Sequence, residues 1–228
     1  MAELNHFRKY AIAQSEEGDP LEIVRDDIRV VCLGFDTSRH RFVEIGALTS
    51  GDRDSFMRRA RTASSLRHPS VASVVDYGKE DGSCFYVCDF VDGEVISDYA
   101  TRVKGIDPGT VVAWLVQLAE GCAVLEAEGL HPGVSSARLS MTGSCSASLS
   151  IVDHGIIASG SELHLGEEFA DLLEALTNYQ DSGESPVYPP EVGELTATLR
   201  EMGSADEVVA ALQDVGLDCD EPGFSPGQ

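Results

Sequence analysis

Residues 129–143 read GLHPGVSSARLSMTG and lie between a long apolar, helix-like segment and a short apolar run that ends in IVDHG at 151–155. Gly129 and Pro132 are typical of a helix end followed by a loop. The polar side chains of this loop are mostly Ser, with one His and one Arg, and none is a carboxylate. The stretch has the shape of a catalytic loop but contains no acidic side chain. The neighbouring segments indicate the reason.

The second half of the chain has helical periodicity. Asp107 and Pro108 form an N-cap and first-turn signal for a helix to about residue 128, whose apolar residues keep a 3, 4 spacing. A hairpin is predicted over 137–153, and a helix near 167–179. Ser204 and Glu207 form a capping box for a last helix.

The first half alternates as strands do. Segments 26–36 and 40–48 predict a hairpin, 54–66 a helix, and 70–78 with 83–93 a second strand pair. The change of period near residues 89–93 predicts a small antiparallel-sheet lobe to about residue 90 and a helical lobe from about 95, with a cleft between them. The fold class is α+β.

Charge and composition exclude several classes of protein. The chain has 39 acidic and 16 basic residues, a net charge of −23, and after Lys104 only Arg138 and Arg200 are basic. Such a surface repels phosphates, so neither nucleic acid nor an anionic membrane is an expected partner. No apolar run approaches the length that spans a bilayer, no signal peptide is visible, and six scattered Cys are typical of a reducing compartment. We expect a cytoplasmic protein.

The order of elements, with the motifs that they carry, resembles the protein-kinase fold, and specifically serine/threonine kinases. SLRHPSVASVVDYG (65–78) resembles the segment that follows the kinase C-helix, and FYVCDFVDGEVISDYA (85–100) resembles the fifth strand, the hinge and the next helix. LHPGVSSARL (130–139) falls at the catalytic loop, and VDHG (152–155) at Asp-Phe-Gly. The resemblance implies that Cys88 is the gatekeeper, and that Asp89, Phe90 and Val91 form the hinge.

The resemblance also places unusual residues at positions that bind phosphate in kinases. LEIVRDDIRVV (21–31) has no glycine, and Asp26 and Asp27 occupy the expected phosphate-binding turn. Gly46 occupies the position of the Lys that kinases carry on the third strand of this lobe. Arg59 occupies the position of the helix-C Glu, so the charge there is reversed. We expect the Arg59 guanidinium to pair with Asp153 or with Glu44.

In the loop itself, Gly133 occupies the position of the catalytic Asp of kinases, and Arg138 occupies the position of their metal-binding Asn. No base then remains to accept a substrate proton, which accounts for the loop without a carboxylate. Asp153 is retained, but it is only a weak candidate metal ligand, and a polar residue that closes a hairpin turn is the favoured interpretation.

These residues predict a catalytically inactive pseudokinase that acts as a protein-interaction or allosteric module. One alternative is an atypical nucleotide-dependent transferase that keeps Asp153 and binds ATP with Mg²⁺ weakly. Another is an acidic structural subunit with a vestigial pocket. No catalytic residue, cofactor or metal is expected in the first reading. The expected partner is another protein, bound through the acidic C-terminal half or the Arg58, Arg59 and Arg61 cluster.

The domain boundaries follow from the same reading. An N-terminal extension covers 1–20, the small lobe 21–90, the helical lobe 91–217 with a shortened activation segment, and a flexible tail 218–228.

Overall fold

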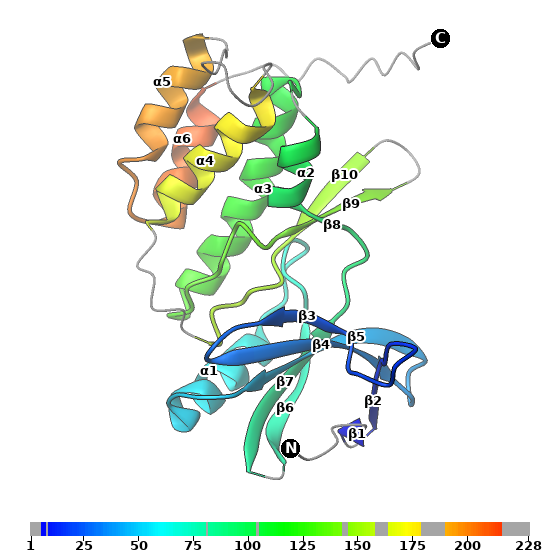
Figure 1. The fold of residues 1–228 in the computed structure, drawn as a ribbon. Helices are drawn as coiled ribbons and strands as arrows, with labels where there is room; N and C mark the ends of the chain where they lie inside the picture. The colour runs from blue at the N-terminus through cyan, green and yellow to red at the C-terminus, as the bar shows by residue number, and fades with distance from the viewer. Residues whose placement is uncertain are drawn as a thin grey trace.

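The chain folds into a sheet-rich lobe and a helical lobe, as the computed structural model shows (Figure 1). The structure describes residues 6–7, 9–80, 82–103, 105–142, 146–157, 164–178 and 190–215. The strands are β1 (His6–Phe7), β2 (Tyr10–Ile12), β3 (Glu22–Arg25), β4 (Arg29–Asp36), β5 (Arg41–Leu48), β6 (Val74–Glu80), β7 (Ser83–Asp89), β8 (Glu94–Val95), β9 (Arg138–Thr142) and β10 (Ser146–Ser150). The helices are α1 (Arg53–Ser65), α2 (Ile96–Arg102), α3 (Pro108–Glu126), α4 (Leu165–Thr177), α5 (Pro190–Leu199) and α6 (Ala205–Asp214).

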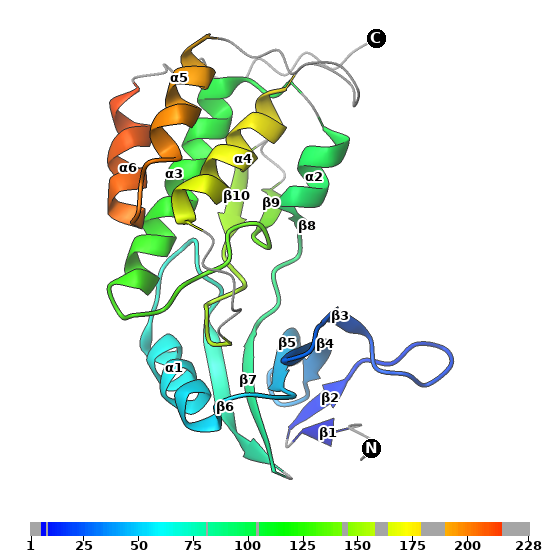
Figure 2. The same cartoon turned by 60° about the vertical axis from the view of Figure 1, so that its left-hand side comes forward.

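The sheet lobe is one antiparallel sheet in the order β1-β2-β4-β5-β7-β6, with β3 also paired to β4. The predicted hairpin is β4 and β5, which pair from Arg29↔Leu48 to Asp36↔Arg41. β2 and β3 pair with the two halves of one edge of β4, and β1 pairs with β2. The sheet therefore includes two strands from the predicted N-terminal extension of 1–20. The loop that joins β2 to β3 projects from the lobe (Figure 2).

α1 matches the helix predicted over 54–66. The Asp52 carboxylate accepts hydrogen bonds from the backbone N–H groups of Asp54 and Ser55, which satisfies the first turn. Phe56, Ala60 and Ala63 are buried on one face of the helix. α1 packs on β6 and β7, and the partly buried Met57 adds to the same hydrophobic cluster.

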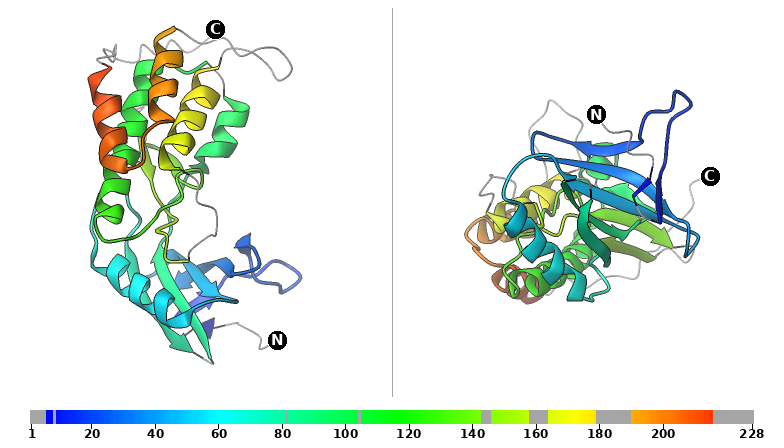
Figure 3. Two further views of the ribbon diagram at one scale, coloured as in Figure 1. Left: turned by 90° about the vertical axis from the view of Figure 1, so that its left-hand side faces the viewer. Right: turned by 90° about the horizontal axis from the view of Figure 1, so that it is seen from below.

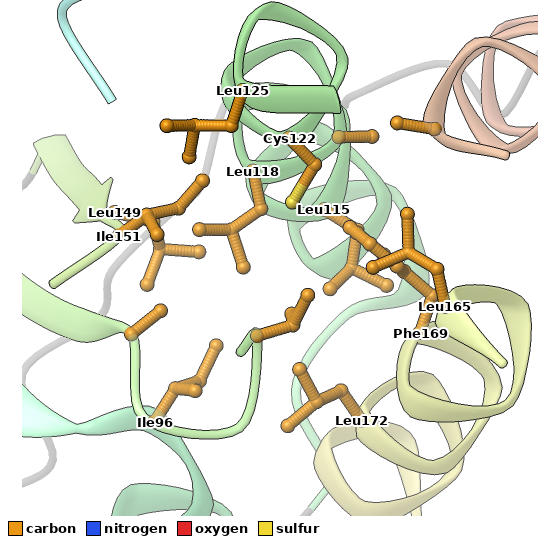
Figure 4. Packing of buried hydrophobic residues seen from close by; sticks show 14 of the residues in the cluster. Ile96, Leu115, Leu118, Cys122, Leu125, Leu149, Ile151, Leu165, Phe169 and Leu172 are labelled. Carbon is orange, nitrogen blue, oxygen red and sulfur yellow. The ribbon is translucent and has the colours of Figure 1, made fainter. Parts of the chain in front are cut away.

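The helical lobe is built around α3, as the predicted apolar stripe requires. Asp107 caps the helix and Pro108 occupies its first turn. Leu115, Leu118 and Cys122 of α3 pack against the end of β10 and against α4 (Figure 4). The capping box of Ser204 and Glu207 is present at the start of α6.

α3 also corrects one expectation from the sequence. It is 19 residues long and apolar enough to cross a membrane by length and composition, although no such run was expected. More than half of that stretch is buried inside the protein, and ten residues of the helix are buried. A mostly buried core helix passes this test without spanning a bilayer, so α3 is weak evidence for a membrane span.

Residues 90–93 join the lobes, between the end of β7 and the start of β8. The predicted hairpin over 137–153 is β9 and β10, and β8, which was not predicted, pairs with β9 to give a second, three-stranded sheet. Figure 3 shows the helical and sheet lobes at opposite ends of the molecule. One hydrophobic cluster continues from α1 and β7 into α3 and α4, so the lobes share a core.

Candidate functional site between the lobes

Five charged or polar side chains from distant parts of the sequence meet between the lobes, and we call this group the interlobe site. Its members are Arg29 (β4), Glu44 (β5), Tyr86 (β7), Arg138 (β9) and Asp153, which follows β10. They lie where the kinase resemblance predicts the nucleotide cleft.

The turn between β3 and β4 orients Arg29. The Asp26 carboxylate accepts hydrogen bonds from the backbone N–H groups of Ile28 (2.9 Å) and Arg29 (2.8 Å), and from Nε of Arg29 (2.9 Å). Burial acts to raise the pKa of Asp26, but these hydrogen bonds outweigh it and the pKa is lowered. The two predicted turn carboxylates thus differ in role, since Asp26 holds the turn and anchors an arginine.

Arg29 reaches across to Asp153. Its Nη1 donates to Asp153 Oδ2 at 2.8 Å, and each side chain is only 18% exposed. The other oxygen of Asp153, Oδ1, accepts from the backbone N–H of Gly155 at 3.1 Å. Both carboxylate oxygens of the one retained metal-ligand candidate therefore have partners within the chain.

A second ion pair joins the lobes through Glu44 and Arg138. Arg138 Nη2 lies 3.2 Å from Glu44 Oε1, with the side chains 12% and 5% exposed. This is an ion pair without good hydrogen-bond alignment, because that Glu44 oxygen has no hydrogen-bond partner in the described part of the chain. Burial raises the pKa of Glu44, and the charge of Arg138 opposes that rise only in part.

The hinge side of the site fixes Arg138 from two directions. Arg138 Nη1 donates to the Gly93 carbonyl at 3.2 Å, and the guanidinium lies over the Phe90 ring at 5.7 Å. Asp89 pairs with Arg41 at 2.8 Å. Cys88 is fully buried in β7, and burial holds the pKa of its thiol well above the usual value.

Tyr86 fills the space beside Gly46. The two residues are opposite each other in β5 and β7, and a Cβ added at Gly46 would overlap the tyrosine ring and lie 2.7 Å from its hydroxyl oxygen. Tyr86 is buried, which holds its pKa well above the usual value. Its ring packs near those of Phe56 (6.2 Å) and His154 (6.4 Å). A longer side chain at position 46 does not fit this arrangement.

The prediction for Arg59 is wrong. Asp153 is paired with Arg29 and Glu44 with Arg138, and Arg59 forms no ion pair within the described ranges. Arg59 instead lines a separate cavity of about 190 Å³ at the start of α1, together with Ile28, Leu48 and Ile156. The cations that neutralise the interlobe carboxylates come from β4 and β9 and not from the helix.

The loop quoted first runs directly past Asp153. The backbone N–H of Gly133 donates to the Asp153 carbonyl at 3.2 Å, and a Cβ at Gly133 would lie 3.2 Å from Asp153 Oδ2. The following amides of Val134 and Ser135 donate to Oε2 of Glu168 in α4, at 2.8 and 3.3 Å. Burial raises the pKa of Glu168, and these two bonds oppose the rise. Glu168 holds the loop in place, a role that its helical periodicity alone does not indicate.

Comparison with known proteins gives sequence relatives among bacterial kinases. No family model matches the chain. It is 35% identical over 106 residues, or 44% of the chain, to the serine/threonine-protein kinase pkn2 of Myxococcus xanthus. It is 32% identical over 68 residues, or 30% of the chain, to PrkC of Bacillus subtilis, and 28% identical over 134 residues, or 56% of the chain, to PknD of Mycobacterium tuberculosis. The matched segments span only 13%, 10% and 20% of these relatives.

Solved structures match over nearly the whole chain. The PknI kinase domain of Mycobacterium tuberculosis superposes with a TM-score of 0.68 at 17% identity, covering 94% of this chain and 99% of that one. Rad53 residues 1–466, solved in complex with AMP-PNP, superposes with a TM-score of 0.67 at 11% identity, covering 90% of this chain and 64% of that one. At these identities the superpositions establish the fold. The chain therefore has the two-lobed α+β fold of protein kinases, and parts of its sequence are similar to bacterial serine/threonine kinases.

Proposed function

We propose that this chain is a catalytically inactive kinase-like domain that acts as a protein-interaction or allosteric module. The observation that carries the proposal is that the charged groups of the interlobe site neutralise one another. Arg29 pairs with Asp153, and Glu44 pairs with Arg138, across the place where a kinase holds its nucleotide.

Metal-bound triphosphate fits these residues poorly. Mg²⁺ is held by carboxylate oxygens, and both oxygens of Asp153 already accept hydrogen bonds. Removing one partner of a buried ion pair costs about 3–5 kcal/mol, and the partial exposure of Arg29 and Asp153 reduces that figure. Since about 1.4 kcal/mol is a tenfold change in affinity, each 1.4 kcal/mol spent on opening the pairs and not recovered by contacts to the nucleotide weakens its binding tenfold.

Proton transfer is also unsupported at the loop. Gly133 has no side chain to accept a proton from a substrate hydroxyl, and the nearest carboxylate, on Asp153, is bound to Arg29. A positioned general base contributes roughly 10²–10⁴ in rate. An enzyme with this site would therefore need another group to supply that factor.

The alternative with a specific observation behind it is an atypical nucleotide-dependent transferase. Asp153 remains 18% exposed, and Arg29 would become free to bind phosphate if the pair opened. The acidic structural subunit would likewise bind no nucleotide, and it is separated from the leading proposal by whether partners bind to a defined surface.

A thermal-shift titration combined with a label-transfer assay tests the proposal. Millimolar ATP, ADP or GTP, with Mg²⁺ or Mn²⁺, should leave the melting temperature unchanged, and no label should reach a generic protein substrate. A ligand at 100 times its Kd stabilises by about 2.7 kcal/mol, which moves the midpoint of a chain of this size by several degrees. A reproducible shift that Asp153→Ala abolishes would overturn the proposal and favour the transferase instead.

A further inference from the structure

A cavity of about 500 Å³ lies on the helical lobe, outside the interlobe site. It is formed between α2 and α4, which pack beside each other (Figures 1 and 2), and it extends to Ser135 of the loop and to Arg200 after α5. None of its lining residues belongs to the interlobe site. Its volume is within the range of sites that hold small ligands or a few peptide side chains.

The floor of this cavity is apolar and its rim is acidic. Ala100 and Leu172 are buried side chains of the floor, and Ala175 continues it along α4. The carboxylates of Glu167, Glu168 and Asp171 line the same space. An occupant should therefore combine an apolar side chain with a positive charge.

Among the residues that the structure describes, this rim is neutralised only in part, because Arg200 pairs with Asp171 and no cation pairs with Glu167 or Glu168. After Lys104 the sequence has only two basic residues, Arg138 and Arg200. Arg138 is held by Glu44 at the interlobe site, and Arg200 is shared between Asp171 (2.9 Å) and Glu174 (3.3 Å). Glu167 has no ion-pair partner within the described ranges, and only one of the two oxygens of Glu168 accepts a hydrogen bond there.

The electrostatic environment of Glu168 agrees with this assignment. Burial raises its pKa, and the negative charges of Asp153 and Asp171 raise it further. An added cation in the cavity would offset that repulsion, whereas an anion would increase it. The charges around Glu168 therefore favour a cationic ligand over an anionic one.

We propose that the α2–α4 cavity docks a cationic peptide segment of a partner protein, with an Arg or Lys on the acidic rim and a neighbouring apolar side chain on the floor. This inference rests on the proposed interaction role and gives that role a surface and a partner class. The net charge of −23 makes a second copy of the chain a poorer occupant than a basic peptide.

The test is a positional-scanning array of immobilised nonapeptides incubated with the full chain, followed by fluorescence anisotropy with the best peptide. Wild type should select Arg or Lys next to Leu, Ile or Met. Glu167→Gln with Asp171→Asn should weaken binding at least tenfold, and Ala175→Phe, which fills the floor without changing charge, should do the same. Glu120→Gln with Glu128→Gln removes two exposed charges from α3 and its end, and it should leave affinity within twofold.

Three results would overturn the proposal: no retained peptide, no basic preference, or equal loss in the α3 control. Dimers that depend on Glu167 and Asp171 in sedimentation would also overturn it, in favour of a second copy. Circular dichroism melting of each variant separates lost binding from lost folding. Nucleotide titration of the same samples reports on the interlobe site independently, so the peptide site can fail while the inactive-kinase proposal stands.

Discussion

Arg29 and Asp153 are 124 residues apart in sequence, and their side chains form a 2.8 Å ion pair that links the sheet lobe to the segment after β10. The pair depends on the Asp26 turn, because the same guanidinium is held by Asp26 through Nε. The hairpin of β3 and β4 is thereby attached to the position where the kinase resemblance predicts a metal ligand. In the proposed function, this contact fills space that a nucleotide phosphate occupies in an active kinase.

Arg29→Ala should lower the free energy of unfolding by about 1–3 kcal/mol, because it leaves the partly buried Asp153 carboxylate without its cation. Urea unfolding measures the change. The double variant Arg29→Ala with Asp153→Asn should lose less unfolding free energy than the two single variants lose in sum, as expected for paired residues in a double-mutant cycle. Arg25→Ala breaks the exposed pair with Glu22 and should have a much smaller effect. Additive losses at positions 29 and 153 would refute the coupling.

Glu44 should give the wild type a distinctive pH dependence. Its folded pKa is raised by burial, so the folded protein binds this proton more tightly than the unfolded chain does. The contribution of Glu44 to stability is then fully present below its unfolded pKa, about 4.5, and is lost as pH rises through the raised folded pKa. The difference in unfolding free energy between wild type and Glu44→Gln should fall as pH rises above 4.5. A difference that grows with pH would mean that Arg138 outweighs burial.

Gly46→Ala should destabilise the protein by about 1–3 kcal/mol, since the added methyl group overlaps the buried ring of Tyr86. Differential scanning calorimetry would record a lower melting temperature. Gly193→Ala is the matched control, because nothing lies within 4 Å of a Cβ there and the residue is in α5. Replacing Gly by Ala in a helix should raise stability by about 0.5–1 kcal/mol. If the melting temperatures of both variants shift in the same direction, packing against Tyr86 does not explain why position 46 is a glycine.

Glu168→Ala should loosen the loop without unfolding the domain. The variant removes the acceptor for the Val134 and Ser135 amides, and those two N–H groups should exchange with deuterium faster than in wild type. The backbone N–H of Ala205, which is held by Glu126 in α3, serves as an internal reference and should exchange at an unchanged rate. Unchanged protection at Val134 would show that Glu168 does not hold the loop.

Most of the long elements were predictable because they have a clear period, but the ten-residue helix α5 was not predicted. The strands that became β4 to β7 alternate, and α1, α3, α4 and α6 carry apolar stripes. Two of these helices, α3 and α6, also begin at caps that the sequence indicates. β1, β2 and β8 have two or three residues each, too few for a period. β2 and β8 pair with the longer strands β4 and β9, and β1 pairs with β2.

The partners within the interlobe site were less predictable than its residues. Glu44, Arg138 and Asp153 were identified as candidates, but the sequence favoured Arg59 as the cation. Arg29 was missed, because its reach depends on the geometry of the Asp26 turn. Tyr86 read as an ordinary strand residue, and only the register of β5 against β7 places it beside Gly46. Pairings set by register and turns are not visible in a linear pattern.

Calorimetric titration of Mg-ATP into the wild type tests the central claim most directly, with Arg29→Ala and Glu44→Ala/Arg138→Asn as companion samples. If the two ion pairs occupy the nucleotide position, the wild type should give no saturable heat up to millimolar nucleotide, and the companions should bind no more weakly than wild type. Saturable wild-type binding at micromolar Kd that is lost in Asp153→Ala would contradict the claim, because Asp153 would then be holding metal and nucleotide while paired with Arg29.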